Sequence, residues 1–121
     1  MPEELCKKGL AVINEINEDL NINGNIINLD NLLLELYNLL SKDASISKDK
    51  LVDKVIEEAE KILKKYSPAY YQISDEINSF EYAEVYKYVY KYMQKIICRF
   101  CMAAGAAFLL FVYIHSDYII R

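Results

Sequence analysis

The residue types in this sequence that could do chemistry are two neighbouring cysteines and one histidine. Cys98 and Cys101 have two residues between them, the spacing of redox and metal-binding pairs, and His115 follows. A structural zinc ion needs four ligands, and a catalytic thiolate needs a base and a partly exposed, electropositive site. No second cysteine pair is present, and only Arg99 stands nearby. We therefore interpret both cysteines as small buried residues.

Motifs for other chemistries are absent from the sequence, which contains no glycine-rich phosphate loop, no HExxH and no nucleophile elbow. Residues 1–60 carry six lysines against thirteen acids, whereas nucleic-acid binding needs a basic surface. We expect no enzymatic activity, no cofactor, no metal ion and no nucleic-acid partner. The odd number of cysteines, three, and the lack of an apolar signal segment predict a reducing, intracellular location.

Tyrosine is unusually frequent, with eleven in 121 residues. The ring gives a large rigid contact area and the hydroxyl a polar end, so tyrosine is enriched at binding surfaces. Eight of them cannot all be buried in one small core, so we expect some to line a surface groove or a dimer interface. An AT-rich coding sequence with ordinary half-buried rings is the alternative explanation. The eight are Tyr66, Tyr70, Tyr71, Tyr82, Tyr86, Tyr88, Tyr90 and Tyr92.

The elements that would position these residues are helices joined by short loops. Apolar residues recur every three or four positions, the period of an amphipathic helix, and glycine and proline, at three and two, are too scarce for a β-sandwich or barrel. Asn28 and Ser79 are placed to cap helices, and Pro68 ends the third one. We predict an all-α fold, a single compact helical bundle over residues 1–121. Its first five helices are predicted at Glu3–Leu20, Leu29–Leu40, Ser47 or Lys48 to Lys65, Ala69–Ile77 and Phe80–Met93.

The last predicted helix differs from the others because Ile96–Ile114 holds one charge, Arg99, in nineteen residues. A helix that is apolar on all sides is either the centre of a bundle or a membrane span. At about 1.5 Å per residue it is about 28 Å long, close to the roughly 30 Å hydrocarbon layer of a bilayer. The small residues from Ala103 to Ala107 would let neighbouring helices approach closely, and we favour the buried central helix.

Two stretches of the second half carry further patterns. Within residues 51–62 an apolar residue is followed by a small residue, an acid and another apolar residue, at Leu51, Val55, Ala59, Glu60 and Ile62. Residues 92–95 (YMQK) then lead into the apolar helix through Ile96 and Ile97, with the Ala103–Ala104 pair beyond. This order resembles the third and first homology motifs of the Bcl-2 family of apoptosis regulators, particularly its short viral members. The similarity covers residues 51–115.

This resemblance implies a Bcl-2-like fold and an inhibitor of apoptosis, acting in the cytoplasm or at the mitochondrial outer membrane of a virus-infected host cell. An amphipathic helix of a pro-apoptotic partner would lay its apolar residues in a surface groove. Lys95 or Arg99 would pair with an aspartate of that helix. The later helices of the family have no counterpart, so a second copy in a homodimer, or a different fold of residues 1–40, would complete the groove. The predicted groove walls are Tyr70, Tyr71, Tyr86, Val89, Tyr90 and Ile97.

Two other functions are compatible with the sequence. Ile96–Ile114 as a membrane span would make residues 1–90 the domain of a membrane-anchored protein. Helices that pack against a second copy and leave no groove would make the chain an oligomerisation domain.

Overall fold

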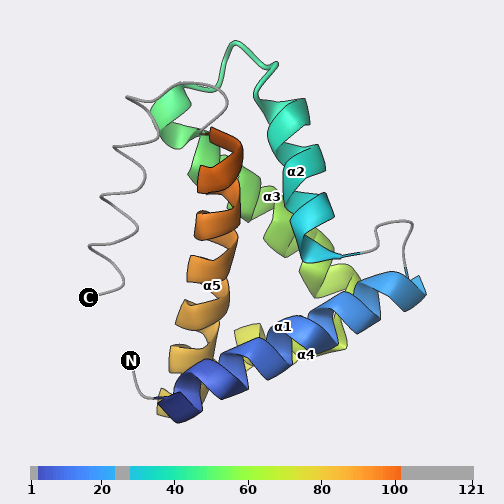
Figure 1. Cartoon of the computed structure of the whole chain (residues 1–121), viewed down its shortest axis with the longest axis vertical. Helices are drawn as coiled ribbons and strands as arrows, with labels where there is room; N and C mark the ends of the chain where they lie inside the picture. The colour runs from blue at the N-terminus through green and yellow to red at the C-terminus, as the bar shows by residue number, and fades with distance from the viewer. Residues whose placement is uncertain (1–2, 24–27, 102–121) are drawn as a thin grey trace.

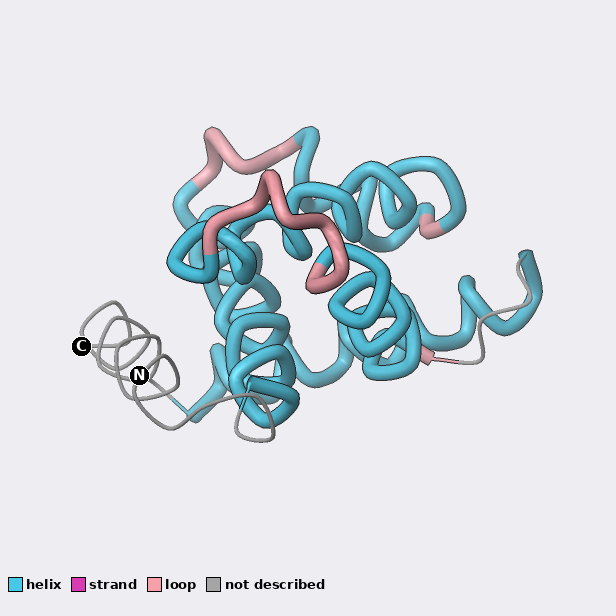
Figure 2. Tube along the Cα trace, turned by 90° about the horizontal axis from the view of Figure 1, so that it is seen from above, coloured by secondary structure: helices cyan, strands magenta, loops and turns pink. Residues whose placement is uncertain are grey.

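The computed structural model describes residues 3–23 and 28–101, and every regular element in this part of the chain is helical. This confirms the predicted helical class. Short loops join the helices from α2 to α5, as the view from above shows (Figure 2). The elements are α1 (Glu3–Asn23), α2 (Leu29–Leu40), the 3-10 turn η1 (Lys48–Lys50), α3 (Leu51–Tyr66), α4 (Pro68–Asp75) and α5 (Phe80–Cys101).

The hydrophobic core lies where α2, α3 and α5 pack against one another and α1 closes one end. Figure 1 shows α2 and α5 upright with α3 behind them, while α1 and α4 cross near their lower ends. Apolar residues at helical spacing fill the interior, as in α1, where Ile13, Ile16 and Leu20 are buried. Each such side chain contributes about 1.5–3 kcal/mol by leaving water. The packed interior therefore sets how far apart the outward-facing sides of α3 and α5 lie.

Side-chain caps define where three of the helices begin. The predicted caps Asn28 and Ser79 each accept a hydrogen bond from the backbone N–H three residues on, at 2.8 and 3.4 Å. Ser67 caps α4 in the same way, because its Oγ accepts from the backbone N of Tyr70 at 3.1 Å. Pro68 occupies the first turn of α4, where a missing N–H leaves no hydrogen bond unmade. As predicted, the third helix ends just before this proline.

Asp19 and Asn17 are among the polar side chains of α1 that fasten it to the other helices. Oδ2 of Asp19 accepts hydrogen bonds from Oγ of Ser67 at 2.9 Å and from the backbone N of Ala69 at 3.2 Å. A carboxylate at this position also suits the positive end of the α4 dipole. Oδ1 of Asn17 accepts from the backbone N of Leu29 at 2.8 Å. These bonds fix the start of α2 and the junction between α3 and α4 against α1.

The prediction of a helix end near Met93 is wrong, because α5 continues through Gln94 and Lys95 to Cys101. Glutamine and lysine are good helix formers, and neither glycine nor proline occurs between the ends of α5. Met93 and Ile97 are one turn apart and both fully buried, so a continuous helix keeps one face in the core. The start of the predicted central helix therefore belongs to the same helix as the tyrosines.

The rest of the predicted central helix, residues 102–114, lies outside the described residues. Its assignment as a buried helix or as a membrane span stays a prediction. None of the helices in the described ranges is long and apolar enough to cross a membrane.

Candidate functional site

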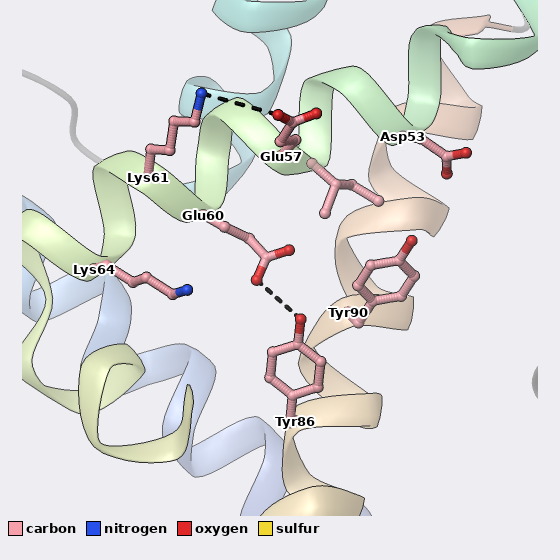
Figure 3. A pocket seen from close by; sticks show the side chains of 8 residues that line it. Asp53, Glu57, Glu60, Lys61, Lys64, Tyr86 and Tyr90 are labelled. Carbon is pink, nitrogen blue, oxygen red and sulfur yellow. Dashed lines mark hydrogen bonds and ion pairs between the residues drawn. The ribbon is translucent and has the colours of Figure 1, made fainter. Parts of the chain in front are cut away.

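A cleft of about 410 Å³ lies between α3 and α5 (Figure 3). Helix α3 supplies the charged side chains of this α3–α5 cleft, and α5 supplies two tyrosine rings. Its lining residues are Asp53, Ile56, Glu57, Glu60, Lys61, Lys64, Tyr86 and Tyr90.

Glu60 lies at the centre of the cleft and is held by two hydroxyl groups. Its Oε2 accepts a hydrogen bond from the hydroxyl of Tyr86 at 2.9 Å and another from the hydroxyl of Tyr70. Burial and the Glu60 carboxylate raise the pKa of Tyr70 above its usual range and that of Tyr86 to about 12. The two hydrogen bonds hold the carboxylate of Glu60 in one position.

The two tyrosine rings of α5 form the other wall. Tyr86 and Tyr90 are one turn apart, and their ring centroids are 6.4 Å apart with an interplanar angle of 31°. Both side chains are half-buried, and burial together with the negative charges of Asp53 and Glu60 raises the pKa of Tyr90. Rings placed this way present apolar surface with polar ends to a ligand.

Several charged residues of α3, in the cleft and beside it, neutralise one another. Nζ of Lys61 lies 3.1 Å from Oε1 of Glu58 and 3.9 Å from Oε1 of Glu57. By contrast, Asp53 and Lys64 form no ion pair with any described residue. Figure 3 shows Lys64 extending toward the centre of the cleft and Asp53 at its other end. These two side chains are available to a ligand.

Of the predicted groove walls, only Tyr86 and Tyr90 line this cleft. Val89 and Ile97 are fully buried in the core, and Tyr70 is fully buried with its hydroxyl on Glu60. A partner helix would reach these three side chains only if the core opened.

The cations predicted to bind a partner's aspartate lie elsewhere. Lys95 and Arg99 are exposed and do not line the cleft. Each follows a cleft tyrosine by nine residues, Lys95 after Tyr86 and Arg99 after Tyr90. Nine residues are about two and a half helical turns, so each cation lies on the opposite side of α5 from its tyrosine. Lys64, one turn after Glu60, extends toward the centre of the cleft, and it was not among the residues predicted for the site.

The residues of the predicted motif helix lie within α3, from Leu51 to Ile62. Leu51, Val55 and Ala59 are buried against the core, Ile62 is half-buried, and Glu60 lies in the cleft. Any amphipathic helix buries one side and exposes the other in this way. The family resemblance therefore stays a prediction.

Tyr71 lines a separate cleft at the junction of α3 and α4, and its side chain is 55% exposed. This cleft, called here the Lys65–Tyr71 cleft, has a volume of about 450 Å³. It shares Lys64 with the α3–α5 cleft, so the two adjoin. None of the described residues that line it is acidic. Its lining residues are Asn23, Lys64, Lys65, Tyr66, Pro68 and Tyr71.

A third cleft lies between α1, α4 and α5, and an ion pair between Lys8 and Glu81 lies at its edge. With about 280 Å³ it is the smallest of the three. Its other lining residues are Ala11, Val12, Ile73, Tyr82 and Val85.

The cysteines predicted to be buried are found in α5. Cys98 is buried in the core and Cys101 is the last residue of the helix, while His115 lies outside the described residues. Within residues 3–23 and 28–101, no group of three or more histidine, cysteine or acidic side chains is placed to hold a metal ion.

Comparison with models of known families, with curated proteins and with solved structures gives no match for this chain. Its function must therefore be inferred from the geometry of the described residues.

Proposed function

We propose that this protein binds an amphipathic helix of a partner in the α3–α5 cleft. The partner would be a pro-apoptotic protein of the Bcl-2 family, and its amphipathic helix is called the death-motif helix below. Sequestering this helix would inhibit apoptosis. The observation that supports this most is the pair of half-buried rings, Tyr86 and Tyr90, beside the fixed carboxylate of Glu60. Because the hydrogen bond to Glu60 already holds Tyr86, less side-chain entropy is lost when a ligand covers that ring.

Binding would use the two kinds of group that the cleft offers. The apolar residues of the partner helix, spaced three, four and seven positions apart, would cover the tyrosine rings. Lys64 would pair with an acidic residue of that helix and fix its register. The inhibitor would act in the cytoplasm of a host cell or at its mitochondrial outer membrane.

Calorimetry with synthetic death-motif peptides tests this proposal. We expect at least one peptide to bind with a dissociation constant of about 10 µM or below, which corresponds to roughly −7 kcal/mol. If none of a set of such peptides binds at that concentration, the proposed function is wrong.

Two pairs of variants locate the binding site. Tyr90→Ala should weaken binding about tenfold or more, because buried tyrosines often dominate the energy of an interface. Tyr82→Ala, which removes a ring from the third cleft, should leave the affinity unchanged. Lys64→Glu should weaken binding and Lys95→Glu should not. The reverse result for the two lysines would place the ligand on the other side of α5. Circular dichroism of each variant shows whether the fold is kept.

A further inference from the structure

The charged groups along α3 that are not ion-paired follow a definite order. Asp53 stands at one end of the α3–α5 cleft, Glu60 at its centre and Lys64 at the other end. Lys65 follows in the adjoining Lys65–Tyr71 cleft, where no described lining residue is acidic. The two clefts together therefore form one continuous surface whose charge changes from negative to positive along α3.

The ion pairs of α3, two of whose members (Glu57 and Lys61) also line the cleft, leave this order intact. Lys54 and Lys61 both lie within 4.0 Å of carboxylate oxygens of Glu57 and Glu58, so these four charges largely cancel. Lys65 contacts the Tyr66 ring, with Nζ 5.2 Å from the ring centroid, and keeps its charge. A ligand lying along the surface would therefore meet acidic groups at the start of α3 and basic groups at its end.

We propose that the partner helix carries charges in the complementary order and lies antiparallel to α3, an inference that rests on the proposed function. Its acidic end would lie over Lys64 and Lys65, and its basic end over Asp53. Lys64 follows Asp53 by eleven positions along α3, a length of about 16 Å at about 1.5 Å per residue. The acidic and basic side chains of the partner are therefore about eleven residues apart as well.

The helix dipole decides between the two directions. In the antiparallel arrangement the acidic residues of the partner lie in its first turn and the basic residues in its last, where each stabilises the helix itself. In the parallel arrangement the same pairing would put acids at its C-terminus and bases at its N-terminus, which disfavours the helix. The same order of charges therefore stabilises both the partner helix itself and its contact with α3.

In this arrangement the residues that precede the partner helix would lie in the Lys65–Tyr71 cleft. Tyr66 and Tyr71 are exposed there, beside two lysines that form no ion pair with a described residue. Acidic residues just before the first turn of the helix would contact these lysines, and an apolar residue among them would cover the rings.

Two synthetic peptides of identical composition test the proposal. Both carry one apolar stripe, but the first has two glutamates in its first turn and two lysines eleven residues on, and the second has these residues exchanged. We expect the full chain to bind the first about tenfold more tightly, because two exposed or half-exposed pairs change from attraction to repulsion. The preference should shrink at about 1 M salt, where the screening length falls to about 3 Å.

A charge-swapped protein separates this preference from the helicity of the peptides. In the double variant Asp53→Lys, Lys64→Glu the preference should invert, or at least fall below twofold, although the peptides are unchanged. The matched control is Glu84→Lys, Lys87→Glu, which exchanges an exposed ion pair of 3.5 Å on α5 outside the two clefts. This control should keep the original preference.

The outcomes distinguish the two proposals. If neither these peptides nor the death-motif peptides bind, helix binding itself is wrong. If both peptides bind equally well, the cleft takes helices but the charge order does not orient them. Tighter binding of the second peptide, or a preference that persists unchanged in the charge-swapped protein, overturns the antiparallel arrangement.

Discussion

The α1–α4 junction and the α3–α5 cleft each contain a carboxylate that accepts two hydrogen bonds, yet their surroundings differ. At the junction, Asp19 binds the buried hydroxyl of Ser67 and the backbone of Ala69, joining parts of the chain about fifty residues apart. In the cleft, Glu60 binds two tyrosine hydroxyls, and one of those rings faces the open space. Asp19 lines none of the three clefts described above.

This difference indicates that the Asp19 carboxylate stabilises the fold, whereas the Glu60 carboxylate positions a side chain of the cleft wall. Asp19 connects backbone and a helix cap, so its loss disturbs the start of α4. Glu60 orients Tyr86, whose ring is half-buried and belongs to the cleft wall. We therefore expect changes at the junction to alter the free energy of unfolding and changes in the cleft to alter ligand affinity. The following variants test that division, from the largest effect to the smallest.

The largest effect is expected for Asp19→Ala. It removes the acceptor of Ser67 and Ala69, and hydrogen bonds to a charged group contribute about 1.5–3 kcal/mol each. Because water replaces part of this at a half-buried site, we expect the free energy of unfolding to fall by about 2–3 kcal/mol. Urea denaturation measures it. Glu18→Ala, an exposed neighbour, should change stability by less than about 0.5 kcal/mol, and equal losses in both variants would contradict the role of Asp19.

The next effect concerns the contact between α1 and α5. A methyl group on Gly9 would overlap the ring of Tyr88, including the Cγ that cannot move away easily. Overpacking of this kind costs about 1–3 kcal/mol, against about 1 kcal/mol that alanine gains within a helix. We expect Gly9→Ala to lower the melting temperature, and the same change in a Tyr88→Ala background to raise it. A stabilising effect in both backgrounds would show that the two helices are not packed this closely.

A smaller loss of stability is expected when either tyrosine that donates a hydrogen bond to Glu60 is changed to phenylalanine. Tyr70→Phe removes a buried hydroxyl and should lower the free energy of unfolding by about 1 kcal/mol. Tyr86→Phe removes a half-exposed hydroxyl, so its loss of stability should be less. Peptide affinity should respond in the opposite order, because only Tyr86 lines the cleft. Equal effects of both variants on affinity would remove the distinction between fold and surface within this network.

The last expected effect is not caused by a substitution and appears only at alkaline pH. A tyrosine ionises near pH 10.0 in an unfolded chain, whereas burial and a neighbouring carboxylate raise the pKa of Tyr86 and of Tyr92 to about 12. The folded state holds these protons more tightly, so the stability they contribute is present below pH 10 and is lost between pH 10 and 12. Titration followed by tyrosinate absorbance should show that some of the tyrosines ionise well above pH 10. That fraction of the absorbance change should be smaller in Tyr86→Phe. A single transition near pH 10 in the folded protein would contradict the burial of these rings.

Much of the fold is predictable because its signals are local. The cap at Asn28 and the leucines that follow define α2 at both predicted ends, and Pro68 separates α3 from α4. The end of the Phe80 helix was not predictable from composition. The sequence becomes more apolar at Ile96, but a helix ends where a breaker or a cap occurs, and neither is present before Cys101.

The site was predictable only in part. The spacing of Tyr86 and Tyr90 places both on one side of a helix, and the structure brings them together. Residue type alone does not say which tyrosine another helix will cover. Tyr70 is buried, for example, whereas its neighbour Tyr71 is exposed. The helical period alone separates Lys95 from Tyr86, because nine residues lead to the opposite side of the helix.

The unbroken course of α5 has a mechanical consequence for the cleft. Helices kink sharply at proline, at glycine pairs or at bulges, and α5 contains neither proline nor glycine from Phe80 to Cys101. We therefore expect α5 to move as one rigid body if it moves at all. A displacement of its last turn would then carry Tyr86 and Tyr90 with it and change their separation from α3. Under that expectation, a group that held the last turn in place would also limit changes in the width of the cleft.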